Sequence, residues 1–263
     1  MTMLYINKEI ADTFEGQDPY NFLEAVECEI YRDVKARKTF RFKLNAKGYF
    51  AKLHSGVGWL EIFKNLFTFR FPIVGARNEW EAIHRVKNLN IATMNIVAYG
   101  ERGWNPARKK SFIITEELIN TISLEDYCKK WKNSPPNPAQ KRNLIKEVAK
   151  IAGRLHRNGI CHRDFYLCHL LLHTEEISFP KISVIDLHRA IIRKDLAARW
   201  VIKDLAGLYY SAKNIGLTQG DLLRFVRHYD GGVLRSSLIK KDSFWRQVNF
   251  RANKMYKKLG PSV

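Results

Sequence analysis

Apolar and polar residues alternate along much of residues 26–54, a pattern typical of β-strands that bury one face. Residues 45–48 interrupt this alternation with turn-forming side chains, which predicts a hairpin loop. Two later stretches rich in β-branched residues continue the pattern. We therefore expect an antiparallel sheet in the first part of the chain. Its expected strands are residues 26–31, 39–44, 49–54, 96–100 and 111–115.

A helix is predicted between the third and fourth strands. In residues 77–88, the spacing of Glu79, Ile83 and Val86 places them on one face, so Glu79 is an acid on the apolar side. A buried carboxylate requires a cationic partner. Lys52, the one charged residue inside the third strand, is the candidate, although a strand lysine more often faces solvent.

Another helical period lies within an apolar insert at residues 55–75. Its large apolar side chains share one face, and its polar side chains lie opposite. This pattern fits two kinds of helix equally well: an ordinary packing helix, or one that binds a membrane surface or a partner. The residues on the apolar face are Trp59, Leu60, Phe63, Leu66 and Phe67.

Beyond residue 118 the period becomes mostly helical. The strongest helix is expected at residues 141–158, where Gly159 supplies a stop signal. Thr218 and Asp221 have the spacing of a capping box at the start of another helix. The remaining helices are expected at about residues 203–214, 219–229 and 244–259.

Composition supports a folded protein of two parts. The 263 residues are 46% hydrophobic and 27% charged, as in globular proteins. We expect an α+β fold with a sheet lobe at residues 1–118 and a helical lobe at residues 119–263. No apolar run approaches the roughly 18 residues that span a bilayer, and the N-terminus lacks the pattern of a signal peptide.

The formal net charge of +19 is large. It indicates a polyanionic neighbour, such as nucleic acid, an anionic membrane, an acidic protein or a phosphorylated glycan, unless it serves only solubility. Four scattered cysteines lack metal-binding spacing, which indicates reduced thiols in a cytosolic protein.

The candidate chemistry centres on two aspartates. Asp164 follows His162 and Arg163 between the strongest helix and a short apolar run, and Asp186 ends a β-branched segment. Either aspartate alone fits a turn that caps a strand. Together with Lys52 and Glu79 they favour phosphotransfer, in which one carboxylate orients a hydroxyl and the other binds a metal.

The order of these residues resembles that of the protein-kinase-like fold. His162-Arg163-Asp164 matches the catalytic loop, Asp186 the metal-binding aspartate, and Asp204 the helix aspartate that braces the loop. Lys52 and Glu79 match the strand lysine and helix glutamate of that fold. The resemblance implies a bilobal structure, with an antiparallel sheet and one main helix in the N-lobe and a mostly helical C-lobe.

Several departures from protein kinases narrow the resemblance. No glycine occurs at residues 34–37, Tyr166 replaces the catalytic-loop lysine, and His169 replaces the asparagine metal ligand. Residues 186–188 read Asp-Leu-His in place of Asp-Phe-Gly, and little room remains before Asp204 for an activation loop. With these substitutions the chain resembles, over nearly its full length, the lipopolysaccharide core heptose(I) kinase family of Gram-negative bacteria.

That resemblance implies transfer of the ATP γ-phosphate to the first inner-core heptose, by a peripheral protein at the cytoplasmic face of the inner membrane. It implies Mg²⁺ as cofactor and acyl carrier protein as a partner, whose acyl group needs an apolar slot; the aromatic insert is one candidate for it. The implied roles are: Asp164 catalytic; Lys52, Glu79, Lys35, Arg37, Glu116 and Leu118 for ATP; Asp186, with His169 as a further candidate, for metal; His162, Arg163 and Asp204 as supports; and Arg189 and Arg193 for the positive charge that Tyr166 lacks or for substrate anions.

Other functions remain open on the residues alone. Another small-molecule kinase of this fold, acting on Kdo, heptose II or an aminoglycoside, has the same motifs, although cationic acceptors suit a +19 chain poorly. A nucleic-acid-binding protein would explain the charge, but no recognisable binding motif is present, so we do not expect one. The Cys-His pairs at residues 161–162 and 168–169 have atypical zinc spacing. No hydrolase elbow or phosphate-binding P-loop occurs.

Overall fold

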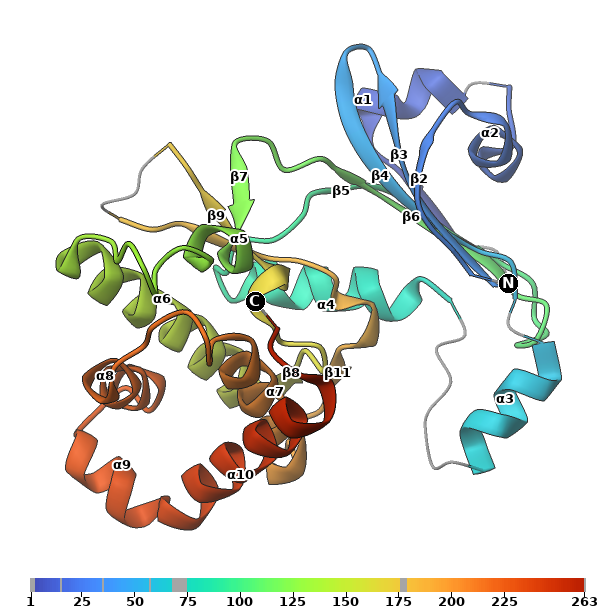
Figure 1. The fold of residues 1–263 in the computed structure, drawn as a ribbon. Helices are drawn as coiled ribbons and strands as arrows, with labels where there is room; N and C mark the ends of the chain where they lie inside the picture. Colours follow the sequence, from blue (N-terminus) through green and yellow to red (C-terminus); the bar gives the residue numbers. More distant parts are fainter. Residues whose placement is uncertain are drawn as a thin grey trace. The chain divides into compact units, whose positions relative to one another are not determined.

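The computed structural model of the protein describes residues 3–14, 16–34, 36–56, 58–67, 75–175 and 179–262. The chain divides into two compact units (Figure 1). The first consists of Met1–His84 and Met94–Ile119, and the second of Arg85–Thr93 and Asn120–Val263. The boundary predicted from the sequence lies after residue 118. It assigns residues 85–93 to the first lobe, whereas the structure places them in the second unit.

Among the described residues of the first unit, a sheet of six antiparallel strands is ordered β1-β5-β6-β4-β3-β2. All five expected strands are present, although β2 begins three residues later than the alternation indicated. The hairpin loop is confirmed, since Asn45 and Ala46 have positive φ angles of 48° and 64° between β3 and β4. The strands are β1 (Met3–Ile6), β2 (Glu29–Val34), β3 (Arg37–Leu44), β4 (Lys47–His54), β5 (Ile96–Arg102) and β6 (Lys110–Glu116).

Short N-terminal helices pack on this sheet. The helices α1 (Lys8–Ala11) and α2 (Pro19–Ala25) and the 3-10 turn η1 (Asp12–Phe14) place Ile10, Phe14, Tyr20 and Leu23 in one core with sheet residues such as Phe40 and Phe112. Sequence reasoning missed these elements and strand β1. Segments of four to seven residues are too short to show a helical period.

Helix α4 (Arg77–Asn88) has the bounds that its period predicted. Trp80 stacks on Tyr99 of β5, with ring centroids 4.5 Å apart. The hydroxyl of Ser111 on β6 accepts a hydrogen bond from the Ala76 amide at 2.9 Å, which positions the start of the helix. Helix α3 (Gly58–Phe67) precedes α4, and residues 68–74 of the apolar insert lie outside the described residues.

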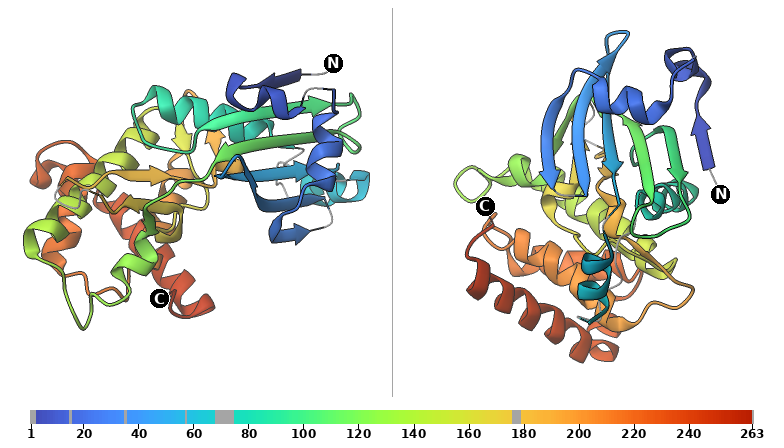
Figure 2. Two further views of the ribbon diagram at one scale, coloured as in Figure 1. Left: turned by 90° about the horizontal axis from the view of Figure 1, so that it is seen from above. Right: turned by 90° about the vertical axis from the view of Figure 1, so that its right-hand side faces the viewer.

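The second unit is mostly helical, as expected (Figure 2). Helix α6 packs on α8, and α7 packs on α10. In its described part, strands β10, β9 and β7 form one small sheet, and β11 pairs with β8. The elements are β7 (Thr121–Ser123), α5 (Leu124–Cys128), α6 (Pro138–Arg157), β8 (Ile160–Cys161), η2 (Leu167–His169), β9 (Leu170–His173), β10 (Ile182–Val184), η3 (Leu187–Arg189), β11 (Ile191–Ile192), α7 (Ala198–Ser211), α8 (Gln219–Tyr229), α9 (Leu234–Lys240) and α10 (Asp242–Leu259).

Local signals set several helix ends correctly. Thr218 and Asp221 form the predicted capping box of α8. Gly159 has φ +77°, and a Cβ there would lie 1.8 Å from the Arg193 carbonyl oxygen, so the stop after α6 requires glycine. Helix α7 begins five residues before its predicted start, and α9 was not predicted. Within the described ranges, no helix has the length and apolarity to cross a bilayer.

Candidate active site

Asp204 on α7 anchors the loop that follows β8. Its carboxylate accepts hydrogen bonds from the amides of His162 at 2.6 Å and Arg163 at 2.7 Å, and its Oδ2 lies 3.3 Å from Nε2 of His156. The side chain is buried. Burial alone would raise the pKa of this carboxyl, but the hydrogen bonds and charges of its partners outweigh it and lower the pKa. Asp204 therefore stays ionised and fixes the loop backbone.

The backbone bends at Arg163. This residue has φ +72°, in the left-handed region that few non-glycine residues adopt, and its own amide and that of His162 donate to the Asp204 carboxylate. The Arg163 guanidinium lies over the ring of Trp200, with 5.2 Å between its carbon and the ring centroid. The bend, which includes Asp164, thus depends on contacts with α7.

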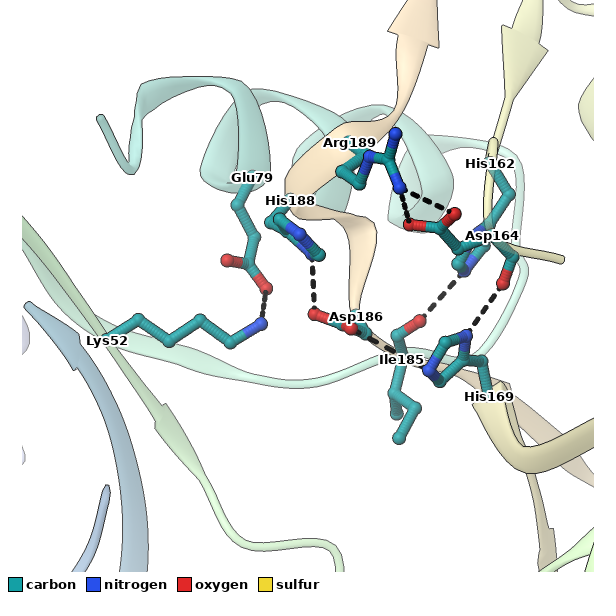
Figure 3. Close-up of polar contacts among 9 residues, drawn as sticks. All are labelled: Lys52, Glu79, His162, Asp164, His169, Ile185, Asp186, His188 and Arg189. Atoms are coloured by element: carbon teal, nitrogen blue, oxygen red, sulfur yellow. Dashed lines mark hydrogen bonds and ion pairs between the residues drawn. The ribbon is translucent and has the colours of Figure 1, made fainter. Parts of the chain in front are cut away.

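Arg189 holds the carboxylate of Asp164 (Figure 3). One guanidinium nitrogen of Arg189 donates to Oδ1 at 3.0 Å and to Oδ2 at 3.1 Å. Tyr166, at the position where protein kinases carry a lysine, cannot supply this charge. Burial, together with the Asp164 carboxylate, raises the pKa of the Tyr166 hydroxyl, so the ring remains neutral.

His169 in η2 connects Asp164 to Asp186. Its Nδ1 lies 2.7 Å from the carbonyl oxygen of Asp164, which can only accept, so Nδ1 carries a proton in this contact. The other ring nitrogen, Nε2, lies 3.7 Å from Oδ2 of Asp186. In a neutral ring this Nε2 has a lone pair, so two electron donors face one another.

Asp186 has φ +59° at the start of η3, so it also occupies the left-handed region. His188 lies two residues further and directs its Nδ1 to Oδ1 of Asp186 at 2.8 Å. The two aspartate loops are tied together through Ile185, whose amide donates to the His169 carbonyl and whose carbonyl oxygen lies 2.9 Å from Nε2 of His162. Burial lowers the pKa of His162, which favours its neutral form.

These contacts leave Asp186 suited to a divalent cation. Oδ1 is oriented by His188, while Oδ2 faces Nε2 of His169. Such outer hydrogen bonds commonly fix metal-binding carboxylates and imidazoles. No group of three or more His, Cys, Asp or Glu side chains that could hold a metal occurs in the described residues, so the remaining ligands of a cation here would come from water or phosphate.

The first unit contains the expected ion pair between Lys52 and Glu79 (Figure 3). Nζ of Lys52 on β4 lies 2.7 Å from Oε1 of Glu79 on α4. The Glu79 side chain is only 2% exposed and that of Lys52 16%. The acid on the apolar face of α4 thus has its cation on the sheet, as its position on that face and the need of a buried acid for a cation predicted.

The other residues expected to bind ATP or substrate lie farther apart along the chain. Arg37 begins β3, and Lys35 lies outside the described residues. Glu116 ends β6 and accepts a bond from the Asn95 amide group at 2.7 Å, and Leu118 follows it. In the second unit, Arg193 has an exposed side chain, and no ion pair joins it to Asp164 among the described residues.

Sequence reasoning gave no role to several residues that shape these sites. His188 orients Asp186, and His156 contacts Asp204. Arg41 forms two hydrogen bonds to Glu117, at 2.8 and 2.7 Å, just after β6. Only His188 had a visible signal, because it lies two residues after the candidate metal ligand in the Asp-Leu-His segment.

Comparison with known proteins assigns these features to a family. The model of the lipopolysaccharide kinase (Kdo/WaaP) family matches residues 21–229. The chain is 45% identical to lipopolysaccharide core heptose(I) kinase WaaP of Pseudomonas aeruginosa over 97% of its length and 96% of that protein. It is 44% identical to the WaaP protein of Escherichia coli, covering 96% of this chain and 97% of that protein.

A solved structure of WaaP in complex with acyl carrier protein superposes with a TM-score of 0.85 and 41% identity, covering 97% of this chain and 99% of the other. The predicted protein-kinase-like α+β fold is thereby confirmed. Because the family model covers most of the sequence and these relatives cover nearly all of it, the chain belongs to the lipopolysaccharide kinase (Kdo/WaaP) family.

Proposed function

We propose that this kinase transfers the γ-phosphate of ATP to a hydroxyl group of the first heptose of the lipopolysaccharide inner core. Its relatives at 44–45% identity bear the name of that activity. The observation that carries the proposal is the Asp164–His169–Asp186 arrangement, in which the imidazole of His169 bridges the backbone carbonyl of Asp164 and the carboxylate of Asp186 within one unit. Sugar phosphorylation needs such positioning and charge neutralisation, because the protein forms no covalent bond to the phosphate.

Asp164 is the proposed catalytic residue. Its carboxylate would accept a hydrogen bond from the sugar hydroxyl, orient the oxygen for attack and accept the proton late in transfer. Asp204 holds the loop backbone, and Arg189 holds the carboxylate. During transfer the Arg189 guanidinium is also suited to stabilise negative charge on phosphate oxygens, a role that the neutral Tyr166 cannot fill.

Asp186 and His169 are the proposed metal ligands. The oxygen of Asp186 and the oriented Nε2 of His169 face the same point, which fits a divalent cation such as Mg²⁺. A bound cation would neutralise phosphate charge during transfer. His188 holds Asp186 in the required orientation, and the His169 ring is fixed by the Asp164 carbonyl.

Lys52 is the proposed ligand of the ATP phosphates, with Glu79 aiming its ammonium group. Glycine-rich backbone is absent between β2 and β3, so side chains such as Arg37 and Lys35 would contact the phosphates there. The backbone near Glu116 and Leu118, after the last sheet strand, would contact the adenine base. These assignments extend the family's ATP dependence to individual residues of this chain.

Transfer of labelled phosphate from ATP to dephosphorylated core glycolipid tests the proposal. Wild-type protein should label the glycolipid, and folded Asp164→Asn should lose at least about a thousandfold in kcat, since the variant cannot accept the hydroxyl proton. Asp195→Asn, an exposed aspartate elsewhere in the second unit, is the matched control and should retain activity. Undiminished transfer by Asp164→Asn would refute the assignment.

We also propose acyl carrier protein as a partner, because a WaaP protein has been solved in complex with it. The second unit supports this proposal with an apolar cavity of about 350 Å³ between α5, α6, α7, α8 and α10. Its volume lies within the range of ligand pockets. An aliphatic acyl chain matches its lining, which includes Leu124, Trp131, Leu144, Val148, Leu208, Ala212, Phe225 and Trp245.

Acylated and unacylated forms of acyl carrier protein distinguish this use of the cavity. The acylated form should raise the Tm of the kinase, because the chain would bury apolar surface that binds only the folded state. The unacylated form should raise it much less. Equal stabilisation by both forms would exclude the cavity as the acyl site.

The proposed acceptor is a membrane glycolipid, so we propose that the protein works at the cytoplasmic face of the inner membrane. The net charge of +19 favours an anionic surface. Sedimentation of the protein with membranes at low salt, and its release at high salt, would be expected from this charge. Equal recovery in the soluble fraction at both salt concentrations would argue against the location.

A further inference from the structure

Helix α3 exposes four large apolar side chains among its described residues. Trp59, Leu60, Phe63 and Phe67 fall within one third of the helix circumference by their spacing. Their exposed fractions are 48%, 89%, 51% and 83%. The rings of Trp59 and Phe63 stack with centroids 5.9 Å apart, so part of this face is ordered by its own contacts.

A loop with similar exposed chemistry lies beside the start of α3. The Gly58 amide donates to the carbonyl oxygen of Ala107 at 3.0 Å, which joins α3 to the loop between β5 and β6. Gly56 makes this approach possible, because a Cβ there would lie 2.7 Å from the same oxygen. The joined loop exposes 88% of the Trp104 side chain.

This surface, formed by α3 and Trp104, is costly to leave in water. The five side chains are each 48–89% exposed, and removing such apolar surface from water is favourable. Contiguous apolar patches on soluble proteins commonly mark interaction sites. The ordinary packing role that the sequence left open is absent for these side chains, since their apolar face is exposed.

We propose that α3 and Trp104 form a membrane-docking surface that lies in the interface of an anionic phospholipid bilayer. The proposal rests on the proposed function, because that acceptor is anchored in a membrane. An amphipathic helix lying in the interface plane buries such a stripe among headgroups and acyl chains, and tryptophan is enriched at that depth. Charge complementarity favours an anionic bilayer. Arg108 in the same loop is exposed and makes no ion pair with a described residue, and the whole chain has a net charge of +19.

Flotation with vesicles of phosphatidylethanolamine and phosphatidylglycerol tests the surface. The full-length double variant Leu60→Ser/Phe67→Ser should partition onto vesicles about tenfold or more less than wild type, because two exposed apolar anchors are removed. Trp104→Ser should weaken partitioning separately. Phe179→Ser is the matched control, because Phe179 is 77% exposed but lies in the second unit, and it should partition like wild type. Equal partitioning of wild type and the double variant would overturn the proposal.

Further measurements separate the other occupants and the proposed function itself. Loss of acyl carrier protein binding by the double variant, with vesicle partitioning unchanged, would overturn the proposal in favour of a protein partner. A larger wild-type species in solution that the double variant converts to monomer would overturn it in favour of self-association. Phosphate transfer to core oligosaccharide freed of lipid should be unaffected in the double variant, whereas failure of wild type in that reaction would count against the proposed function alone.

Discussion

A single guanidinium nitrogen of Arg189 contacts both carboxylate oxygens of Asp164, at 3.0 and 3.1 Å. Among the described residues, no other cation forms an ion pair with Asp164. Arg189 comes from η3, three residues after Asp186, so the loop of the proposed metal ligand supplies the charge that the proposed catalytic loop lacks. The replacement of the kinase lysine by Tyr166 is thus compensated from a different segment of the chain.

Replacing Arg189 by methionine should lower kcat about a hundredfold and change KM for ATP little. The guanidinium positions Asp164 and stabilises charge that develops during transfer, and loss of one such group typically costs this much. Arg189→Lys should recover only part of the rate, because one ammonium that contacts Asp164 leaves none of the further N–H donors that the guanidinium can direct to phosphate oxygens. Steady-state kinetics on core glycolipid measures both variants, and an unchanged kcat in Arg189→Met would contradict the role.

Replacing His169 by asparagine should change which divalent cation the protein prefers. An imidazole ligand favours Mn²⁺ over the harder Mg²⁺, whereas an amide oxygen suits Mg²⁺. Direct titration with each cation in the presence of ADP should show Mn²⁺ affinity falling about tenfold relative to Mg²⁺ in the variant. His173→Asn, on strand β9, is the control and should leave the ratio unchanged. The same ratio in wild type and His169→Asn would remove His169 from the ligand set.

Breaking the Lys52–Glu79 pair should reduce stability more than breaking an exposed pair on the same helix. Lys52→Met leaves the buried Glu79 carboxylate without its ammonium partner, which should cost about 3 kcal/mol of unfolding free energy. Arg77→Met, which breaks an exposed pair with Glu81, should cost less than about 1 kcal/mol. Urea unfolding compares them. The double variant Lys52→Met/Glu79→Gln should regain part of the loss, and strict additivity would show that the two side chains are not coupled.

Long periodic segments carried most of what the sequence predicted. Helix α4 and the capping box of α8 appear with the predicted bounds, because an amphipathic period or a side-chain cap acts within a few residues. The pairing of Lys52 with Glu79 also followed from sequence, since a buried acid restricts its possible partners. Comparison with the WaaP relatives confirms the predicted phosphotransferase class and family.

Contacts between distant segments could not be predicted in this way. The sequence offered Arg189 or Arg193 as the source of the charge that Tyr166 lacks, but the choice of Arg189 depends on the left-handed backbone at Arg163 and Asp186, which neither residue type signals. The orientation of His169 depends on a backbone carbonyl, which has no sequence signature. Similarly, α1 and α2 are too short for periodicity and become visible only through the core they share with the sheet.

Asp204→Asn should lose stability in a pH-dependent manner. The pKa of Asp204 in the folded protein lies below its ordinary value of 3.8, so the unfolded chain binds a proton first as pH falls. The stabilisation by the carboxylate is therefore fully present above about pH 4 and disappears as pH falls through the lower, folded-state pKa. Near neutral pH the variant should be about 3 kcal/mol less stable, because it removes charge-assisted bonds to two amides.

Urea midpoints of wild type and Asp204→Asn at a series of pH values measure this difference. The gap in unfolding free energy should be constant from pH 7 to 5 and should narrow below pH 3.8. Asp195→Asn serves as an exposed control with little effect at any pH. A gap that stays constant down to pH 3 would show that ionisation of Asp204 does not contribute to the loop.

The apolar cavity of the second unit predicts opposite effects for one substitution at two sites. Val148→Phe on α6 adds volume into the cavity of about 350 Å³ and should raise Tm by a few degrees in the absence of acyl carrier protein. Val97→Phe adds the same atoms to the packed core of the first unit, where overpacking should lower stability by about 1–3 kcal/mol. Because the added ring occupies space proposed for an acyl chain, Val148→Phe should also reduce the Tm increase that acylated acyl carrier protein produces. Calorimetry of both variants with and without acylated acyl carrier protein measures these effects, and full stabilisation of Val148→Phe by the acylated form would show that the chain binds elsewhere.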